Sequence, residues 1–164
     1  MPHTDVLQTM AEVAAGFAGF TAILLAIFSR DMPLKTMRVG IVHFLQLSLG
    51  VVMIALLPSV LAPLIEAEET IWQVANGVQG AYHYYLLWWI LSRKQTSVGH
   101  SQMGAGLTVA LAFAGFLVAS LNICVALGLF SELLVFAFLF GLQWYLAMAL
   151  VNFVSILLYR LNIE

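Results

Sequence analysis

Charged side chains are scarce in this sequence. Asp, Glu, Lys and Arg make up only 9% of its 164 residues, whereas 63% of the residues are hydrophobic, and the mean hydropathy is +1.02. A soluble domain carries about 25% charged residues and under half apolar ones. The composition therefore predicts an integral membrane protein with the lipid bilayer as its surroundings.

Positive charge is especially limited. Six Lys and Arg stand against eight Asp and Glu, which gives a formal net charge of −2. Because attraction to a nucleic-acid backbone depends on clustered Lys and Arg, we exclude a nucleic-acid-binding protein. At roughly 20 residues per membrane-spanning helix, the chain has room for about six spans at most and none for a separate domain outside the membrane.

Cysteine is nearly absent, and the start of the chain lacks basic residues. The single cysteine, Cys124, excludes an intrachain disulfide and a cysteine-based metal cluster, and its apolar neighbours favour a buried small side chain. The opening residues, MPHTDVLQTMAEV, contain no Lys or Arg. They do not resemble the basic start of a secretory signal peptide, so we expect no segment to be removed.

The few charged residues divide the chain into five apolar stretches. Each stretch is long enough to cross a hydrocarbon core of about 30 Å. We predict an all-α bundle of five transmembrane helices within one domain, residues 1–164, and expect Pro58 and Pro63 to bend or end the second helix. The predicted helices cover residues 5–28, 37–61, 70–91, 103–129 and 131–159.

The orientation of the helices follows from where the basic residues fall, because Lys and Arg near span ends are retained in the cytoplasm. All six lie on one predicted side: Arg30, Lys35, Arg38, Arg93, Lys94 and Arg160. Most acidic residues lie on the other side: Asp5, Glu12, Glu66, Glu68, Glu69 and Glu132. We expect the N-terminus outside and the C-terminus in the cytoplasm, with the protein in the plasma membrane or, in a bacterium, the inner membrane.

The first and fourth predicted helices share a short string. Residues 13–20, VAAGFAGF, match residues 109–116, VALAFAGF, at six of eight positions, and Gln46 and Gln143 follow at equivalent places. Helices one and two would then correspond to helices four and five in the opposite membrane orientation, as in the inverted repeats of many transporters. Chance is the alternative, because Ala, Phe, Gly and Leu dominate the composition.

Helix packing also explains the small residues of this string. Small side chains let membrane helices approach closely. Two such ridges are present, one with Ala11, Ala15 and Gly19 and the other with Ala110 and Ala114. They predict faces for association within one chain or between copies in a homo-oligomer.

Polar residues inside predicted spans are the strongest functional pointers, because polar groups are expensive in hydrocarbon. Glu12 lies 18 residues before Arg30, roughly 27 Å at about 1.5 Å per residue, which puts it near the outer boundary. In a homo-oligomer its carboxylates would form a ring that attracts cations. The alternative is an interfacial carboxylate that faces water or headgroups.

A polar stripe runs along the third predicted helix. Its residues are spaced by three, three and four, which places them on one face: Gln73, Asn76, Gln79 and His83. The stripe either lines a hydrated path or makes hydrogen bonds between helices. If the repeat holds, Gln46 and Gln143 should approach each other near the bilayer centre.

Several cofactors and reactions are disfavoured. His43 lies five residues from Arg38 and His83 ten from Arg93, a depth difference of about 7.5 Å that argues against haem within one subunit. Retinal needs a lysine at mid-membrane, and none is predicted there. The chain shows no catalytic motif, so we expect no enzyme, no metal and no cofactor.

The hypothesis favoured by the sequence is a homo-oligomeric channel or transporter for an ion or small solute. In it, Glu12 selects charge at the outer mouth, the stripe lines the path, and Gln46 and Gln143 contribute near the centre. The alternative is a non-transport membrane protein, such as an accessory subunit or a carrier of haem, quinone or lipid. An intramembrane enzyme would require His43 or His83 beside Glu12, a tyrosine or a serine in a cavity.

Overall fold

The computed structural model describes residues 3–28, 34–92 and 105–161, and every element in these ranges is helical. The long helices are α1 (Thr4–Phe28), α2 (Leu34–Leu61), α3 (Glu68–Ser92), α5 (Ala105–Ala126) and α6 (Leu134–Leu161), with a short 3₁₀ helix, η1 (Ser131–Leu133), before α6. Each bound lies within three residues of its predicted position. The all-helical fold is therefore as the sequence predicts.

Four of these helices contain segments long and apolar enough to cross a membrane: Thr4–Ile23, Ile41–Leu61, Gly106–Ala126 and Ser131–Ser155. The helix that is not among them is α3, the fifth predicted span. It begins with Glu68 and Glu69 and carries the polar stripe, and these residues lower its mean hydropathy. The chain is thus a helical protein with four apolar helices suited to a membrane.

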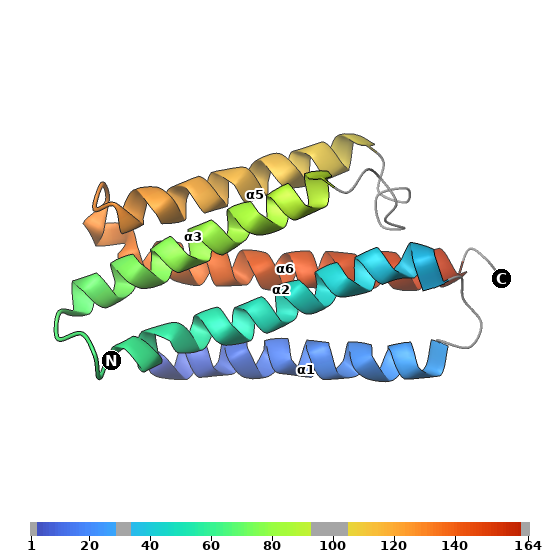
Figure 1. Ribbon diagram of the computed structural model, residues 1–164, viewed down its shortest axis with the longest axis horizontal. Helices are drawn as coiled ribbons and strands as arrows, with labels where there is room; N and C mark the ends of the chain where they lie inside the picture. The colour runs from blue at the N-terminus through green and yellow to red at the C-terminus, as the bar shows by residue number, and fades with distance from the viewer. Residues whose placement is uncertain (1–2, 29–33, 93–104, 162–164) are drawn as a thin grey trace.

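The five long helices lie side by side along a common long axis (Figure 1). The N-terminus, the α2–α3 connection and the η1 turn gather at one end of this bundle, and the C-terminus lies at the other. In the bundle, α3 is packed against α5, α6 and α2, while α1 packs mainly on α2. The inner helix α3 therefore has neighbours on several sides.

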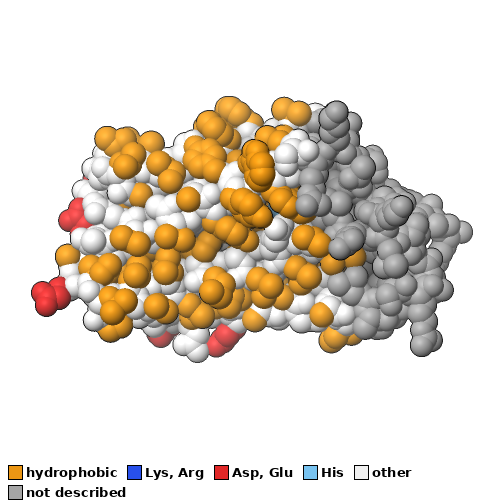
Figure 2. Space-filling model, viewed as in Figure 1, with side chains coloured by type: hydrophobic (Ala, Val, Ile, Leu, Met, Phe, Trp, Pro, Cys, Tyr) orange, Lys and Arg blue, Asp and Glu red, His pale blue; other side chains and the backbone are white. Residues whose placement is uncertain are grey.

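Acidic residues mark the end that holds the N-terminus, where Figure 2 shows red side chains. Glu66, Glu68, Glu69 and Glu132 are all exposed there. Arg30, Arg93 and Lys94 lie outside the described residues, and Lys35, Arg38 and Arg160 belong to parts of α2 and α6 whose side chains are not described. The predicted orientation across the membrane therefore stays a prediction.

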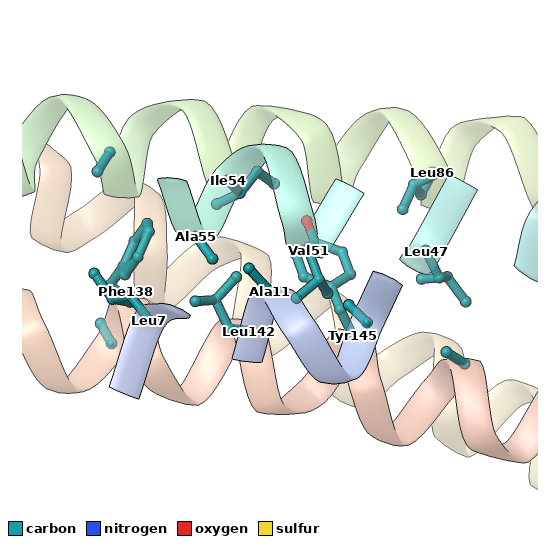
Figure 3. Packing of buried hydrophobic residues seen from close by; sticks show 14 of the residues in the cluster. Leu7, Ala11, Leu47, Val51, Ile54, Ala55, Leu86, Phe138, Leu142 and Tyr145 are labelled. Carbon is teal, nitrogen blue, oxygen red and sulfur yellow. The ribbon is translucent and has the colours of Figure 1, made fainter. Parts of the chain in front are cut away.

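Apolar side chains fill the inside of the bundle and also cover its surface. Leu47, Val51, Phe138 and Leu142 belong to the buried cluster drawn in Figure 3. Large apolar residues such as Met53, 72% exposed, lie on the outside, and Figure 2 shows them over the whole described face. Helices that are hydrophobic on all sides are typical of proteins surrounded by lipid.

Glycine and proline explain two helix ends. Gly128 has a φ of +80°, and its N–H donates to the carbonyl of Val125 while the N–H of Leu129 donates to that of Cys124. This left-handed residue ends α5 at Ala126, before the predicted residue 129. The helix α2 runs through the buried Pro58 and ends at Leu61, before Pro63.

Candidate functional site

The polar stripe of α3 faces α6. Asn76 is fully buried, and its Nδ2 donates to the carbonyls of Trp72, at 2.8 Å, and Leu134, at 2.9 Å. One turn further along, Nε2 of Gln79 donates to the carbonyl of Phe138 at 3.2 Å. The two amides therefore tie α3 to successive turns of α6 through hydrogen bonds between helices.

Gly141 makes room for the second of these bonds. A Cβ added at this glycine would stand 2.5 Å from Nε2 of Gln79 and 3.0 Å from Nδ2 of Asn122. Both contacts are closer than ordinary van der Waals distance. The absence of a side chain on α6 at this point allows the buried amide of Gln79 to reach the backbone.

Gln73, the first residue of the stripe, and the two glutamines of the suspected repeat do not take part in these hydrogen bonds to α6. Gln73 is half-buried, with its Nε2 3.7 Å from the position of a Cβ on Gly128. Gln46 is half-buried, and its carbonyl accepts a 2.7 Å hydrogen bond from the hydroxyl of Tyr82. Gln143 is exposed on α6. Gln46 thus lies beside Tyr82 of α3, whereas Gln143 lies on the surface of α6.

Glu12 and most of the small-residue ridges are exposed. Glu12 accepts a 2.9 Å hydrogen bond from Nε2 of Gln8, one turn earlier in α1. Ala11 is buried against the bundle, whereas Ala15 and Gly19 are exposed, and no side chain among the described residues lies within 4 Å of a Cβ at Gly19. On α5, Ala110 is exposed and Ala114 is half-buried. The ridges are therefore only partly used for packing within the chain.

A cavity of about 100 Å³ lies between α2, α3, α5 and α6. Most of its lining is aliphatic, including Leu47, Leu86, Leu87, Leu111, Met148 and Val151. A few polar side chains also line it: His43, His83, Thr108, Trp144 and Asn152. The hollow is open on one side. An apolar pocket with a small number of polar groups is the usual form of a small-molecule site.

Each helix contributes one face to this cavity. His83, Leu87 and Ile90 follow one another at helical spacing on α3, and Thr108, Ala112 and Gly115 do so on α5. The residues of α6 show the same spacing: Trp144, Met148, Val151 and Asn152. These spacings were visible in the sequence, but no single sequence reveals that the three faces meet.

His43 and His83 both line the cavity. His83 stacks on Tyr145, with ring centroids 4.4 Å apart, and His43 stacks on Trp89, with centroids 5.9 Å apart. Trp89 lies six residues past His83 on α3, about 9 Å along the helix, so the two histidines line different levels of one hollow, in keeping with the separation that the sequence predicts. Stacking on an aromatic ring holds each imidazole in a defined orientation.

A corner of the cavity lies over Gly115 of α5. A Cβ at this glycine would stand 3.5 Å from Nε1 of Trp144, 3.5 Å from Cδ2 of Leu87 and 3.8 Å from Nε2 of His83. Nδ1 of His83 is buried and accepts or donates no hydrogen bond within the described structure. Sequence reasoning did not single out this corner; the available signal was that Trp144 lies 12 residues after Glu132 and 16 before Arg160, far from any charged residue.

Metal binding has little support in the described part of the chain. No group of three or more His, Cys, Asp or Glu side chains comes together among those residues. Cys124 is half-buried on α5 with a free thiol. The site is therefore best described as an apolar cavity with hydrogen-bonding groups on its wall.

Comparisons with protein-family models, with curated proteins and with solved structures found no match. The function is therefore argued from the cavity and the helices around it.

Proposed function

We propose that this chain is an integral membrane protein that binds a small lipophilic molecule in the cavity between α2, α3, α5 and α6. The observation that carries the proposal is the composition of the wall, aliphatic over most of its area and polar at a few points. The aliphatic part would bury the body of the ligand, and the polar groups would orient it. The activity proposed is binding, with no chemical step.

The proposal includes α3 as a fifth membrane span. It has 25 residues, about 37 Å at 1.5 Å per residue, which suffices to cross the hydrocarbon core. Its polar residues point into the bundle, and its outer face is apolar, with Val78, Trp88 and Leu91 exposed. A helix of low mean hydropathy crosses a bilayer when its polar groups find partners within the protein. We place the protein in a plasma membrane, with the acidic end of the bundle outside the cell and the C-terminus in the cytoplasm.

The size of the cavity limits the ligand. An engineered cavity of about 150 Å³ binds benzene, whereas this one measures about 100 Å³ and is open on one side. It therefore suits a small ring or the end of a chain, with the rest of the molecule extending through the opening. A haem macrocycle is too large for this space, so we propose that the two histidines do not hold one.

A binding experiment with cavity-filling variants tests the proposal. Ala112 lines the cavity, whereas Ala110, two residues earlier on the same helix, is exposed on the outside. In nanodiscs, retention of a radiolabelled lipophile such as decylbenzene should exceed that of empty discs. Ala112→Phe should weaken retention by about tenfold, whereas Ala110→Phe should leave it unchanged. Equal retention by both variants and the wild type would show that the cavity is not the binding site.

A second candidate function, conduction of an ion or small solute between several copies, rests on α1. The exposed carboxylate of Glu12 lies on the same helix as Gly16 and Gly19, whose surroundings are open. Helices with small residues at the surface associate closely in membranes. Copies joined through α1 would bring several Glu12 carboxylates together at one end of the interface, where they would select cations.

Ion flux tests this second candidate directly. Protein reconstituted in vesicles should pass a monovalent cation, and Glu12→Gln should lower that flux, while Glu132→Gln, at the same end of the molecule, should leave it unchanged. Gly19→Leu should abolish both the oligomer and the flux, because the added side chain separates the helices. Vesicles that stay tight with the wild-type protein would rule out conduction.

A further inference from the structure

We propose that the corner formed by Gly115, Trp144 and His83 binds a carbonyl oxygen of the lipophilic ligand. This proposal rests on the proposed function and adds the chemical class of the ligand. Three helices meet at the corner, because Gly115 belongs to α5, Trp144 to α6 and His83 to α3. Their positions relative to one another are therefore set by the packing of the bundle.

Gly115 carries no side chain at a point of the cavity wall where two ring nitrogens come near. The position of its missing Cβ lies within 4 Å of two ring nitrogens, Nε1 of Trp144 and Nε2 of His83. The third neighbour is a methyl carbon of Leu87, at 3.5 Å. This position is itself only one bond length from Cα of Gly115, so a ligand oxygen must lie farther out on the cavity side, where two of the three neighbouring groups are polar.

The hydrogen-bonding capacity of the two ring nitrogens determines which kind of ligand atom can bind beside them. The indole N–H of Trp144 is a donor only, so its partner must be an acceptor. A neutral imidazole that carries its proton on Nε2 presents a second donor at the same place. A carbonyl oxygen has two lone pairs and accepts from both groups. A donor such as an amine would find no acceptor on Trp144.

The lack of charged side chains on the described cavity wall excludes charged ligands. The cavity lining that the structure describes includes no Asp, Glu, Lys or Arg. A carboxylate or phosphate would lose its hydration without gaining a positive partner, and an ammonium group would gain no negative one. The ligand at this corner is therefore uncharged and carries its oxygen on an otherwise apolar body.

The other polar groups of the wall are too far along the helices to share this role. Thr108 precedes Gly115 by seven residues, about 10 Å along α5, and Asn152 follows Trp144 by eight, about 12 Å along α6. His43 stacks on Trp89, which follows His83 by six residues, about 9 Å along α3. The corner is consequently one donor site within an aliphatic surround. A quinone ring and the ester or ketone of an acyl chain both supply the required carbonyl.

The test compares carbonyl probes with matched hydrocarbons in nanodiscs. A decyl-substituted benzoquinone is paired with decylbenzene, and methyl laurate with tridecane, each radiolabelled. The wild-type protein should retain the carbonyl member of a pair about tenfold more strongly than the hydrocarbon. The pair that shows the preference identifies a ring or an acyl chain as the source of the oxygen.

Gly115→Ala is the decisive variant, because the added methyl group stands beside both ring nitrogens and narrows the approach of an oxygen without a clash within the protein. All three neighbours lie at 3.5 Å or more, which is ordinary van der Waals contact. Carbonyl probes should bind about tenfold more weakly, and hydrocarbon probes within about twofold of wild type. Gly106→Ala on the same helix is the matched control, because Gly106 is exposed and no described residue stands within 4 Å of a Cβ there.

Trp144→Phe provides an independent variant. It removes the N–H and retains an aromatic ring, so it should abolish the preference for carbonyl probes while hydrocarbon binding persists. Equal binding of carbonyl and hydrocarbon probes by the wild type would overturn the assignment of the corner. An equal loss of both probe types in Gly115→Ala would overturn it as well. Failure of every probe to bind the wild type would overturn the proposed function itself.

Discussion

His83 and Tyr145 stack face to face, with ring centroids 4.4 Å apart and an angle of 28° between the ring planes. Tyr145 is fully buried, and its hydroxyl donates a 3.0 Å hydrogen bond to the carbonyl of Gln79, one turn before His83. One side chain of α6 thus connects the hydrogen-bonded part of the α3 stripe to the histidine of the cavity.

Two substitutions of Tyr145 distinguish the contribution of its hydroxyl to stability from that of its stacked ring. Tyr145→Phe keeps the stacked ring and loses one buried hydrogen bond, so unfolding should become easier by about 0.6 to 1 kcal/mol. Tyr145→Ala also removes the ring and should cost about 3 to 5 kcal/mol. Reversible unfolding in mixed micelles measures both values. If Tyr145→Phe lowered the free energy of unfolding as much as Tyr145→Ala, the expected small contribution of the hydroxyl to stability would be wrong.

Two glycines should respond oppositely to alanine. Gly141→Ala places a Cβ 2.5 Å from Nε2 of Gln79, so it should destabilise the protein by about 1 to 3 kcal/mol. Gly115→Ala meets neighbours only at ordinary contact distance, and alanine is the better helix former by about 0.5 to 1 kcal/mol, so its stability should equal or exceed wild type. Melting of the two variants in the same detergent provides the comparison.

The amide of Asn76 should stabilise the bundle more than that of Gln73. Asn76→Leu removes two buried hydrogen bonds, each worth about 0.6 to 1.7 kcal/mol in a membrane protein, and leaves the leucine beside a backbone carbonyl of α6. Gln73 is only half-buried, so Gln73→Leu should change the free energy of unfolding by less than about 0.5 kcal/mol. Similar losses in the two variants would argue against an internal role of the stripe.

The orientation and the fifth span can be tested by labelling. In a Cys124→Ser background, a membrane-impermeant maleimide should label Glu66→Cys in intact cells, because this position follows α2 at the acidic end. A cysteine at Ser97, beside the basic residues at 93 and 94, should react only after the cells are opened. Labelling of both positions in intact cells would exclude α3 as a membrane span.

Long apolar stretches between the few charged residues determined the all-helical fold and the positions of the helices, and they predict a membrane protein because backbone groups in hydrocarbon must be satisfied within the segment. The spacing of Asn76, Gln79 and His83 also determined that these side chains share one face of α3. Helical periodicity depends only on residue spacing within one segment, so it can be read from the sequence.

Only the tertiary structure decided what that face meets. The rotation and tilt of each helix depend on side chains of its neighbours, such as the empty place at Gly141 that admits Gln79. His43 stacks on Trp89, six residues past His83 on α3, so the two histidines stay separated along the bundle as residue counting predicts. Packing between helices nevertheless brings both side chains to the wall of one cavity, which no single segment reveals.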